Sequence, residues 1–118
     1  MRTFFYLSSC ENCKRIMKVL NLDSAINLID IKKNPLNEYQ LDELFKLSKN
    51  YEVLFSKRAQ LYKQRGLKDK ALNDKNYRML ILEHYTFLKR PILVYDQRIY
   101  IGNSSKVVEA AKAFLNEQ

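Results

Sequence analysis

Arg2–Arg15 reads Arg-Thr-Phe-Phe-Tyr-Leu-Ser-Ser-Cys-Glu-Asn-Cys-Lys-Arg, and this stretch decides the fold that we expect. Its first six residues are mostly aromatic and apolar, which is typical of a buried strand. From Glu11 onward apolar residues recur at helical spacing, at Cys13, Ile16, Met17 and Leu20. The change of period therefore predicts that Cys10 lies where a strand passes into a helix.

The rest of the chain extends this unit at both ends. Residues 25–31 predict a second strand, which a right-handed crossover makes parallel to the first. Residues 92–95 and 98–101 predict a hairpin across Asp96-Gln97, and the apolar residues of 107–115 predict a closing helix.

Residues of about 37–88 predict a helical insertion between the two halves. Asn37 is expected to cap one helix and Asp74 another, whose buried stripe runs from Tyr77 to Leu88. Short helical pieces are expected over 51–65, ended by Gly66. The order β-α-β, insertion, β-β-α predicts an α/β fold, a thioredoxin-like mixed four-stranded sheet in one domain over 1–118.

Composition narrows the class of protein. The chain has 118 residues, 47% of them hydrophobic, and a formal net charge of +8. The absence of an export signal and of a long apolar run predicts a cytoplasmic protein with no membrane contact. Because the basic residues are dispersed, we expect a solvated basic surface and no direct binding of nucleic acid.

Cys10 and Cys13 are the only cysteines, and they indicate thiol chemistry. A thiolate on Cys10 would be favoured by the free N–H groups of the helix start and by Lys14, and opposed by Glu11. Cys13, one turn later, could attack an adduct on Cys10 and close a disulfide. We therefore expect Cys10 to be the nucleophile and Cys13 the resolving thiol.

The two cysteines have two alternative interpretations, a zinc site or chemically inert side chains. A structural zinc site needs four ligands, whereas this pair supplies two and His84 is the single histidine, so no metal site is expected unless a dimer builds one. The cysteines could also be inert. That reading suits Cys13, on the apolar side of its helix, better than Cys10, which follows two serines.

Several blocks together resemble one known family. They are Ser9–Arg15, Asn34-Pro35-Leu36, Ser56-Lys57-Arg58, Leu88–Ile92 and Gly102-Asn103-Ser104. In their order and spacing they resemble the ArsC/Spx/YffB family, which comprises glutaredoxin-linked arsenate reductases and their relatives.

The resemblance to the reductase branch implies an enzyme in which Cys10 attacks an oxyanion or disulfide, Arg58 and Arg90 bind the anion, and Pro91 forms a cis peptide bond beside the cysteines. Guanidinium forks suit tetrahedral oxyanions. No bound cofactor is implied; the reductant would be external, glutathione with glutaredoxin, or thioredoxin. Asn103 stands where that branch has a third arginine, and Tyr6 where it has a histidine.

The Spx branch has the same two-cysteine pattern and implies the alternative function. There the pair is a redox switch on a regulator that binds RNA polymerase, through its α subunit. Asn50 stands where that branch has a glycine used in the polymerase contact. The YffB branch shares the loop at Gly102 but lacks the second cysteine.

Overall fold

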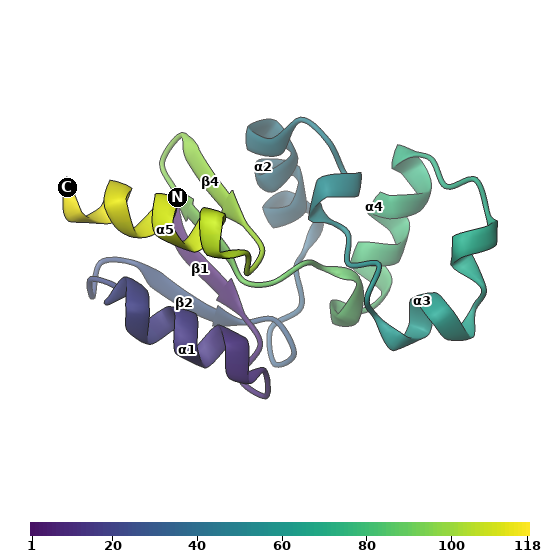
Figure 1. Ribbon diagram of the computed structural model, residues 1–118. Helices are drawn as coiled ribbons and strands as arrows, with labels where there is room; N and C mark the ends of the chain where they lie inside the picture. Colours follow the sequence, from purple (N-terminus) through teal and green to yellow (C-terminus); the bar gives the residue numbers. More distant parts are fainter. The chain divides into compact units, whose positions relative to one another are not determined.

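The computed structural model describes every residue from Met1 to Gln118 (Figure 1). The chain forms two compact units, which we call the sheet unit (Met1–Asn34 with Arg90–Gln118) and the helical unit (Pro35–Lys89). The helical unit coincides closely with the insertion predicted over about 37–88. No helix of the chain is both long and apolar enough to cross a bilayer.

The sheet unit holds four strands and two helices. They are β1 (Arg2–Tyr6), α1 (Glu11–Leu20), β2 (Asn27–Asp30), β3 (Ile92–Tyr95), β4 (Arg98–Ile101) and α5 (Ser105–Asn116). The strand order is β2-β1-β3-β4. β1 is parallel to β2 and antiparallel to β3, and β3 forms the predicted hairpin with β4. The sheet is therefore mixed, as predicted, although β2 is shorter than residues 25–31.

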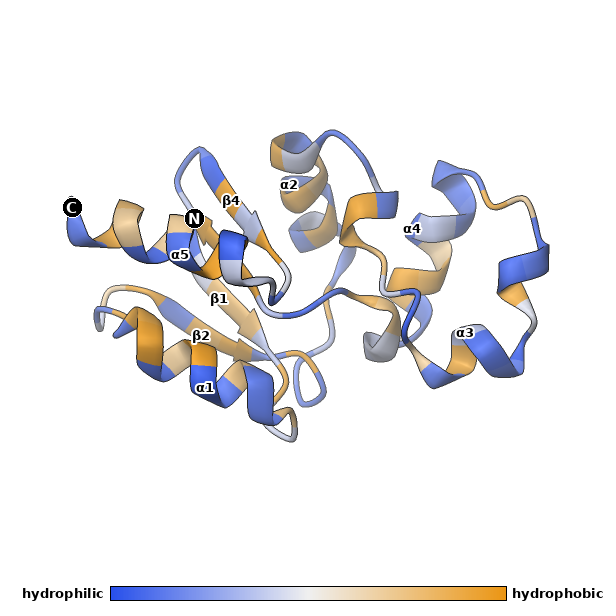
Figure 2. Cartoon of the chain, in the orientation of Figure 1, coloured by the Kyte–Doolittle hydropathy of each residue, from blue (hydrophilic) through white to orange (hydrophobic).

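One face of the sheet is covered by α1 and α5, which also contact each other (Figure 1). Alternate strand residues turn to that face: Phe4 of β1 and Leu93 of β3 are paired in register and pack with Ile16 of α1 and Ala111 of α5. Figure 2 shows the apolar stripe of α1 alternating with its polar residues. This core holds the start of α1 against the end of β1, where Cys10 lies.

The helical unit is built from short elements. They are α2 (Glu38–Ser48), η1 (Glu52–Leu54), α3 (Gln60–Gln64), η2 (Leu67–Asp69), α4 (Asp74–Glu83) and η3 (Tyr85–Phe87), where η denotes a 3₁₀ helix. Asn37 caps α2 as predicted, accepting a hydrogen bond from the backbone N–H of Gln40 at 2.8 Å. Gly66, with φ of 63°, follows Arg65, the C-cap residue of α3, so the helix ends at the predicted place.

Three details of the helical unit differ from prediction. The cap of α4 is Asn73 and not Asp74, which is the first helical residue, where its charge favours the helix dipole. The helix ends at Glu83 and does not continue to Leu88, because the ring Nδ1 of His84 accepts from the backbone N–H of Thr86 at 3.0 Å and starts η3. Residues 55–59, between η1 and α3, are not helical but form a bridge from Phe55 to Leu88.

Candidate thiol site

Cys10 is the N-cap residue of α1. The chain turns sharply after β1, because the backbone N–H of Cys10 donates to the carbonyl of Leu7 at 3.0 Å. The backbone of Cys10 is extended, and its carbonyl accepts the first helical bond, from Lys14 at 3.2 Å. Its half-buried thiol makes no capping bond, so the free N–H groups and the positive end of the α1 dipole favour a negative charge there.

Cys13 is placed very differently, although it lies only one turn further along α1. It is fully buried, on the face of the helix that packs into the unit. Burial, which penalises the charged form, is the main cause that raises the pKa of the Cys13 thiol to about 11. A hydrogen bond to the Cys10 side chain raises it further, whereas one from the Leu7 backbone opposes the rise. Cys13 is therefore protonated at neutral pH.

The two thiols are free, and the Cys10 side chain lies near enough to Cys13 to raise the pKa of the Cys13 thiol. Since burial keeps the proton on Cys13, this thiol is a poor nucleophile in the reduced pair. An accessible thiol at a helix start and a buried protonated neighbour form an asymmetric pair. This asymmetry matches the predicted roles of nucleophile and resolving thiol, which themselves stay predictions.

Arg90 and Pro91 directly precede β3 in the sheet unit, and their part in the site stays a prediction. The peptide bond between them is cis, as predicted, and Pro91 is buried. The carbonyl of Pro91 accepts from the backbone N–H of Gly102 at 2.8 Å, and Gly102 adopts a φ of 93° that favours glycine. The positive charge of Arg90 acts on Cys13 and lowers the pKa of that thiol, against the larger effect of burial.

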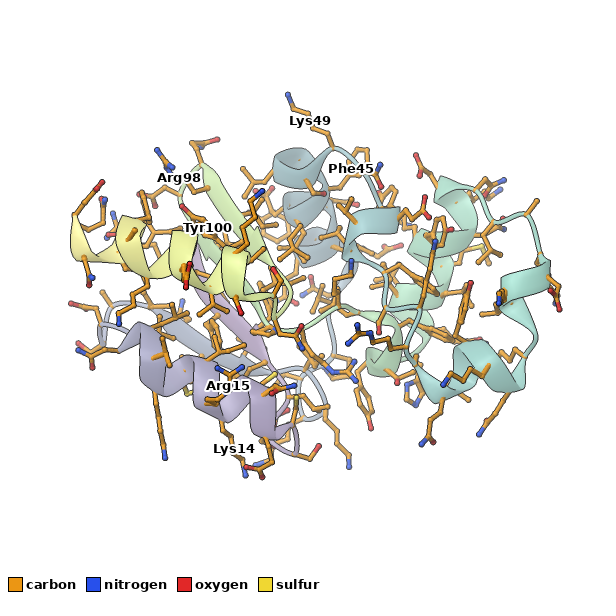
Figure 3. All side chains as sticks on the ribbon, viewed as in Figure 1. Lys14, Arg15, Phe45, Lys49, Arg98 and Tyr100 are labelled. Atoms are coloured by element: carbon orange, nitrogen blue, oxygen red, sulfur yellow. The ribbon has the colours of Figure 1, made fainter.

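Lys14 is exposed and points outward from α1 (Figure 3). Its Nζ lies 3.5 Å from Glu11 Oε1, and both side chains are solvated. Pairs of this kind contribute little free energy. The carboxylate that was expected to oppose the thiolate is thus paired with the cation that was expected to support it.

Arg58 lies in the helical unit, in the extended segment between η1 and α3. The segment is anchored by buried Phe55 and Ala59 and by a hydrogen bond from the Ser56 N–H to the Phe87 carbonyl at 2.8 Å. Arg58 itself is exposed and forms no salt bridge, so its guanidinium is available to an anion. Its part in a site with Cys10 stays a prediction.

Sequence reasoning did not single out Ser8, two residues before Cys10, or Asp30, which binds it. Asp30, the last residue of β2, is buried, and its Oδ2 accepts from the Ser8 hydroxyl at 2.6 Å. The signal was present: Asp30 is an acidic residue near the end of the apolar segment 25–31, which was predicted to lie parallel to the strand that leads into Cys10.

A mixed four-stranded sheet with a cysteine pair at the first strand-helix junction and a cis proline before the third strand defines a protein of the thioredoxin-like fold. The model of the ArsC family matches residues 5–111, and the chain belongs to that family.

Comparisons with individual proteins agree with this assignment. The chain is 26% identical over 112 residues to the global transcriptional regulator Spx of Streptococcus agalactiae, covering 93% of this chain and 82% of that one. A structure described as a possible arsenate reductase from Streptococcus mutans is 30% identical, with a TM-score of 0.65, over 84% of this chain and 87% of that one. Arsenate reductase from Vibrio cholerae shares the fold at 18% identity, with a TM-score of 0.73 and 93% of each chain covered.

Proposed function

We propose that the protein is a thiol-based oxidoreductase of the arsenate reductase type, in which Cys10 attacks a disulfide or an oxyanion and Cys13 resolves the adduct. One observation carries the proposal: the half-buried Cys10 at the start of α1 lies one turn before a fully buried Cys13, whose burial raises its pKa to about 11. In such a pair Cys10 makes the first attack, and Cys13 reacts only in the second step.

With a disulfide as substrate, two exchanges complete the reaction. The Cys10 thiolate attacks one sulfur, a mixed disulfide forms, and the other sulfur leaves as a thiolate. The Cys13 thiol then gives up its proton and attacks the Cys10 sulfur, which releases the second substrate thiolate and leaves a Cys10–Cys13 disulfide. The substrate has gained two electrons, and an external dithiol or two glutathione molecules return the pair to its reduced form.

With arsenate as substrate, Cys10 would displace water from arsenic(V), and attack of Cys13 on the Cys10 sulfur would release arsenic(III). Arg90, whose charge already reaches Cys13, suits the oxyanion, and Arg58 would add a second guanidinium. Asn103 is neutral where a third arginine would be expected, so a disulfide is the better supported of the two substrates.

The test follows oxidation of NADPH with a small disulfide or with arsenate, and with glutathione and glutaredoxin or with thioredoxin as the reductant. Mass spectrometry of the enzyme accompanies it. We expect Cys10→Ser to abolish turnover and Cys13→Ser to accumulate a mixed disulfide on Cys10. Turnover of the Cys10→Ser variant equal to wild type, or no turnover of wild type with any of these substrates, would exclude the enzyme.

A second candidate is a regulator that binds RNA polymerase and responds to oxidation of the same pair. The similarity to Spx over 93% of this chain favours it. The expected result is co-purification with the polymerase α subunit that differs between the oxidised protein and Cys13→Ser. Failure to bind in either redox state would remove this candidate.

A further inference from the structure

Asp30 is a buried carboxylate with no substrate or metal role in the chemistry above. Its exposed fraction is 6%, although aspartate is seldom buried unless it is paired. Oδ2 accepts from the Ser8 hydroxyl at 2.6 Å, and Oδ1 accepts from the backbone N–H of Lys32 at 3.1 Å. The Ser8 backbone also helps to lower the pKa of this carboxyl. The charge is thus stabilised chiefly by one residue of the turn that leads into Cys10.

The carboxylate is held in a fixed position by the sheet. Asp30 pairs in register with Tyr6, the last residue of β1, and the backbone N–H of Ile31 donates to the Tyr6 carbonyl at 2.9 Å. The ends of β1 and β2 are therefore joined at the point where the turn begins. Through its hydrogen bond to the Ser8 hydroxyl, Asp30 connects the ordered end of the sheet to the turn.

The turn that Asp30 holds leads directly into Cys10. Leu7 precedes Ser8, and the Leu7 carbonyl accepts from the backbone N–H of Cys10 at 3.0 Å. The Leu7 backbone also lies near enough to Cys13 to lower the pKa of that thiol. A displacement of Ser8 would therefore move the groups that set the position of Cys10 relative to Cys13.

We propose that Asp30 is a positioning residue for the thiol pair: by binding Ser8 it holds the turn so that the Cys10 sulfur stays within reach of Cys13. The inference rests on the proposed function, because its consequence is faster resolution of an adduct on Cys10. Asp30 acts through Ser8 and does not touch the substrate. An ordered turn raises the effective concentration of one thiol at the other, as preorganisation does in any intramolecular reaction.

The experiment compares Asp30→Ala and Ser8→Ala with wild type and with Asp23→Asn. Asp23 is a matched control, because it is an exposed carboxylate in the same unit whose Oδ1 accepts from the backbone N–H of Ala25, away from the cysteines. Ser8→Ala removes only the hydroxyl, so it keeps the proposal testable if Asp30→Ala does not fold. Each protein is loaded with glutathione at Cys10, and release of glutathione by Cys13 is timed.

We expect release to slow about tenfold in Asp30→Ala and in Ser8→Ala, as loss of a hydrogen bond to a charged group would produce, and to be unchanged in Asp23→Asn. The two effects should not multiply in the double variant, because Asp30 acts through Ser8. A merely stabilising role would lower the midpoint of urea unfolding without changing this rate.

Release rates within about twofold of wild type in both folded variants would overturn the proposal, given the spread of hydrogen-bond energies. If wild type itself never releases glutathione, the proposed function fails. Asp30 is then judged by the rate at which iodoacetamide alkylates Cys10: a change in Asp30→Ala that Asp23→Asn does not show supports positioning, and equal rates refute it.

Discussion

Removal of Cys10 should leave a thiol that barely reacts. In a Cys10→Ser variant the remaining Cys13 is fully buried, and burial is the main cause that raises its pKa from the ordinary value of 9.0 to about 11. At about pH 8, the thiolate fraction of a thiol falls about tenfold for each unit by which its pKa is raised. The rise to about 11 therefore lowers the thiolate fraction of Cys13 about a hundredfold. Alkylation requires the thiolate, so the rate should fall at least in proportion.

Part of the rise comes from Cys10 itself, through its hydrogen bond and its charge. The serine hydroxyl of the variant can still accept from the Cys13 thiol, and burial is unchanged, so most of the effect should remain. Because a buried sulfur also has to wait for α1 to open, a hundredfold reduction is a lower bound.

The assay is alkylation by iodoacetamide, followed by mass spectrometry. The reference rate is that of the same variant unfolded in urea, and Cys13→Ser, which keeps the half-buried Cys10, is the matched control. We expect Cys13→Ser to react quickly in the folded state. If folded Cys10→Ser reacts within about tenfold of its unfolded rate, the thiolate argument is wrong and Cys13 is not a protected resolving thiol.

Three further outcomes are expected. Because the pKa of Cys13 is higher in the folded than in the unfolded protein, its contribution to stability is complete below about pH 9 and is lost as the pH rises through about 11. Over this range the free energy of unfolding in urea should fall by about 2–3 kcal/mol, and Cys13→Ser should not show this fall. The hydrogen bond from Ser8 holds the pKa of Asp30 below its ordinary value of 3.8, so stability should fall as the pH drops below that value. Asp30→Asn should make stability depend less on pH in this acid range, and an unchanged dependence would contradict the assignment. Ser104→Ala, which removes the cap that accepts from the Val107 N–H at 3.2 Å, should cost about 1 kcal/mol in thermal unfolding, with Ser9→Ala on the exposed side of the cysteine turn as a control near zero.

The local elements could be predicted where neighbouring residues determine them. The apolar spacing of α1, the cap at Asn37 and the hairpin after Ile92 depend on contacts within a few residues, and all three are present in the structure. The predicted end of α4 was wrong because a side chain competes with the helix. The His84 ring accepts a hydrogen bond from the backbone N–H of Thr86, which the apolar periodicity alone assigns to the helix.

Cys10 and Cys13 follow from the sequence by itself, because two thiols three residues apart at a strand-helix junction must lie together near the helix start. Only the tertiary structure decided that Cys10 is half-buried and Cys13 fully buried. Burial of Cys13 depends on which side of α1 packs into the sheet unit, and the hold on Ser8 depends on Asp30, 22 residues away and brought close only by the pairing of β1 with β2. Spacing determines which residues can meet, but desolvation and long-range hydrogen bonds exist only once the chain has folded.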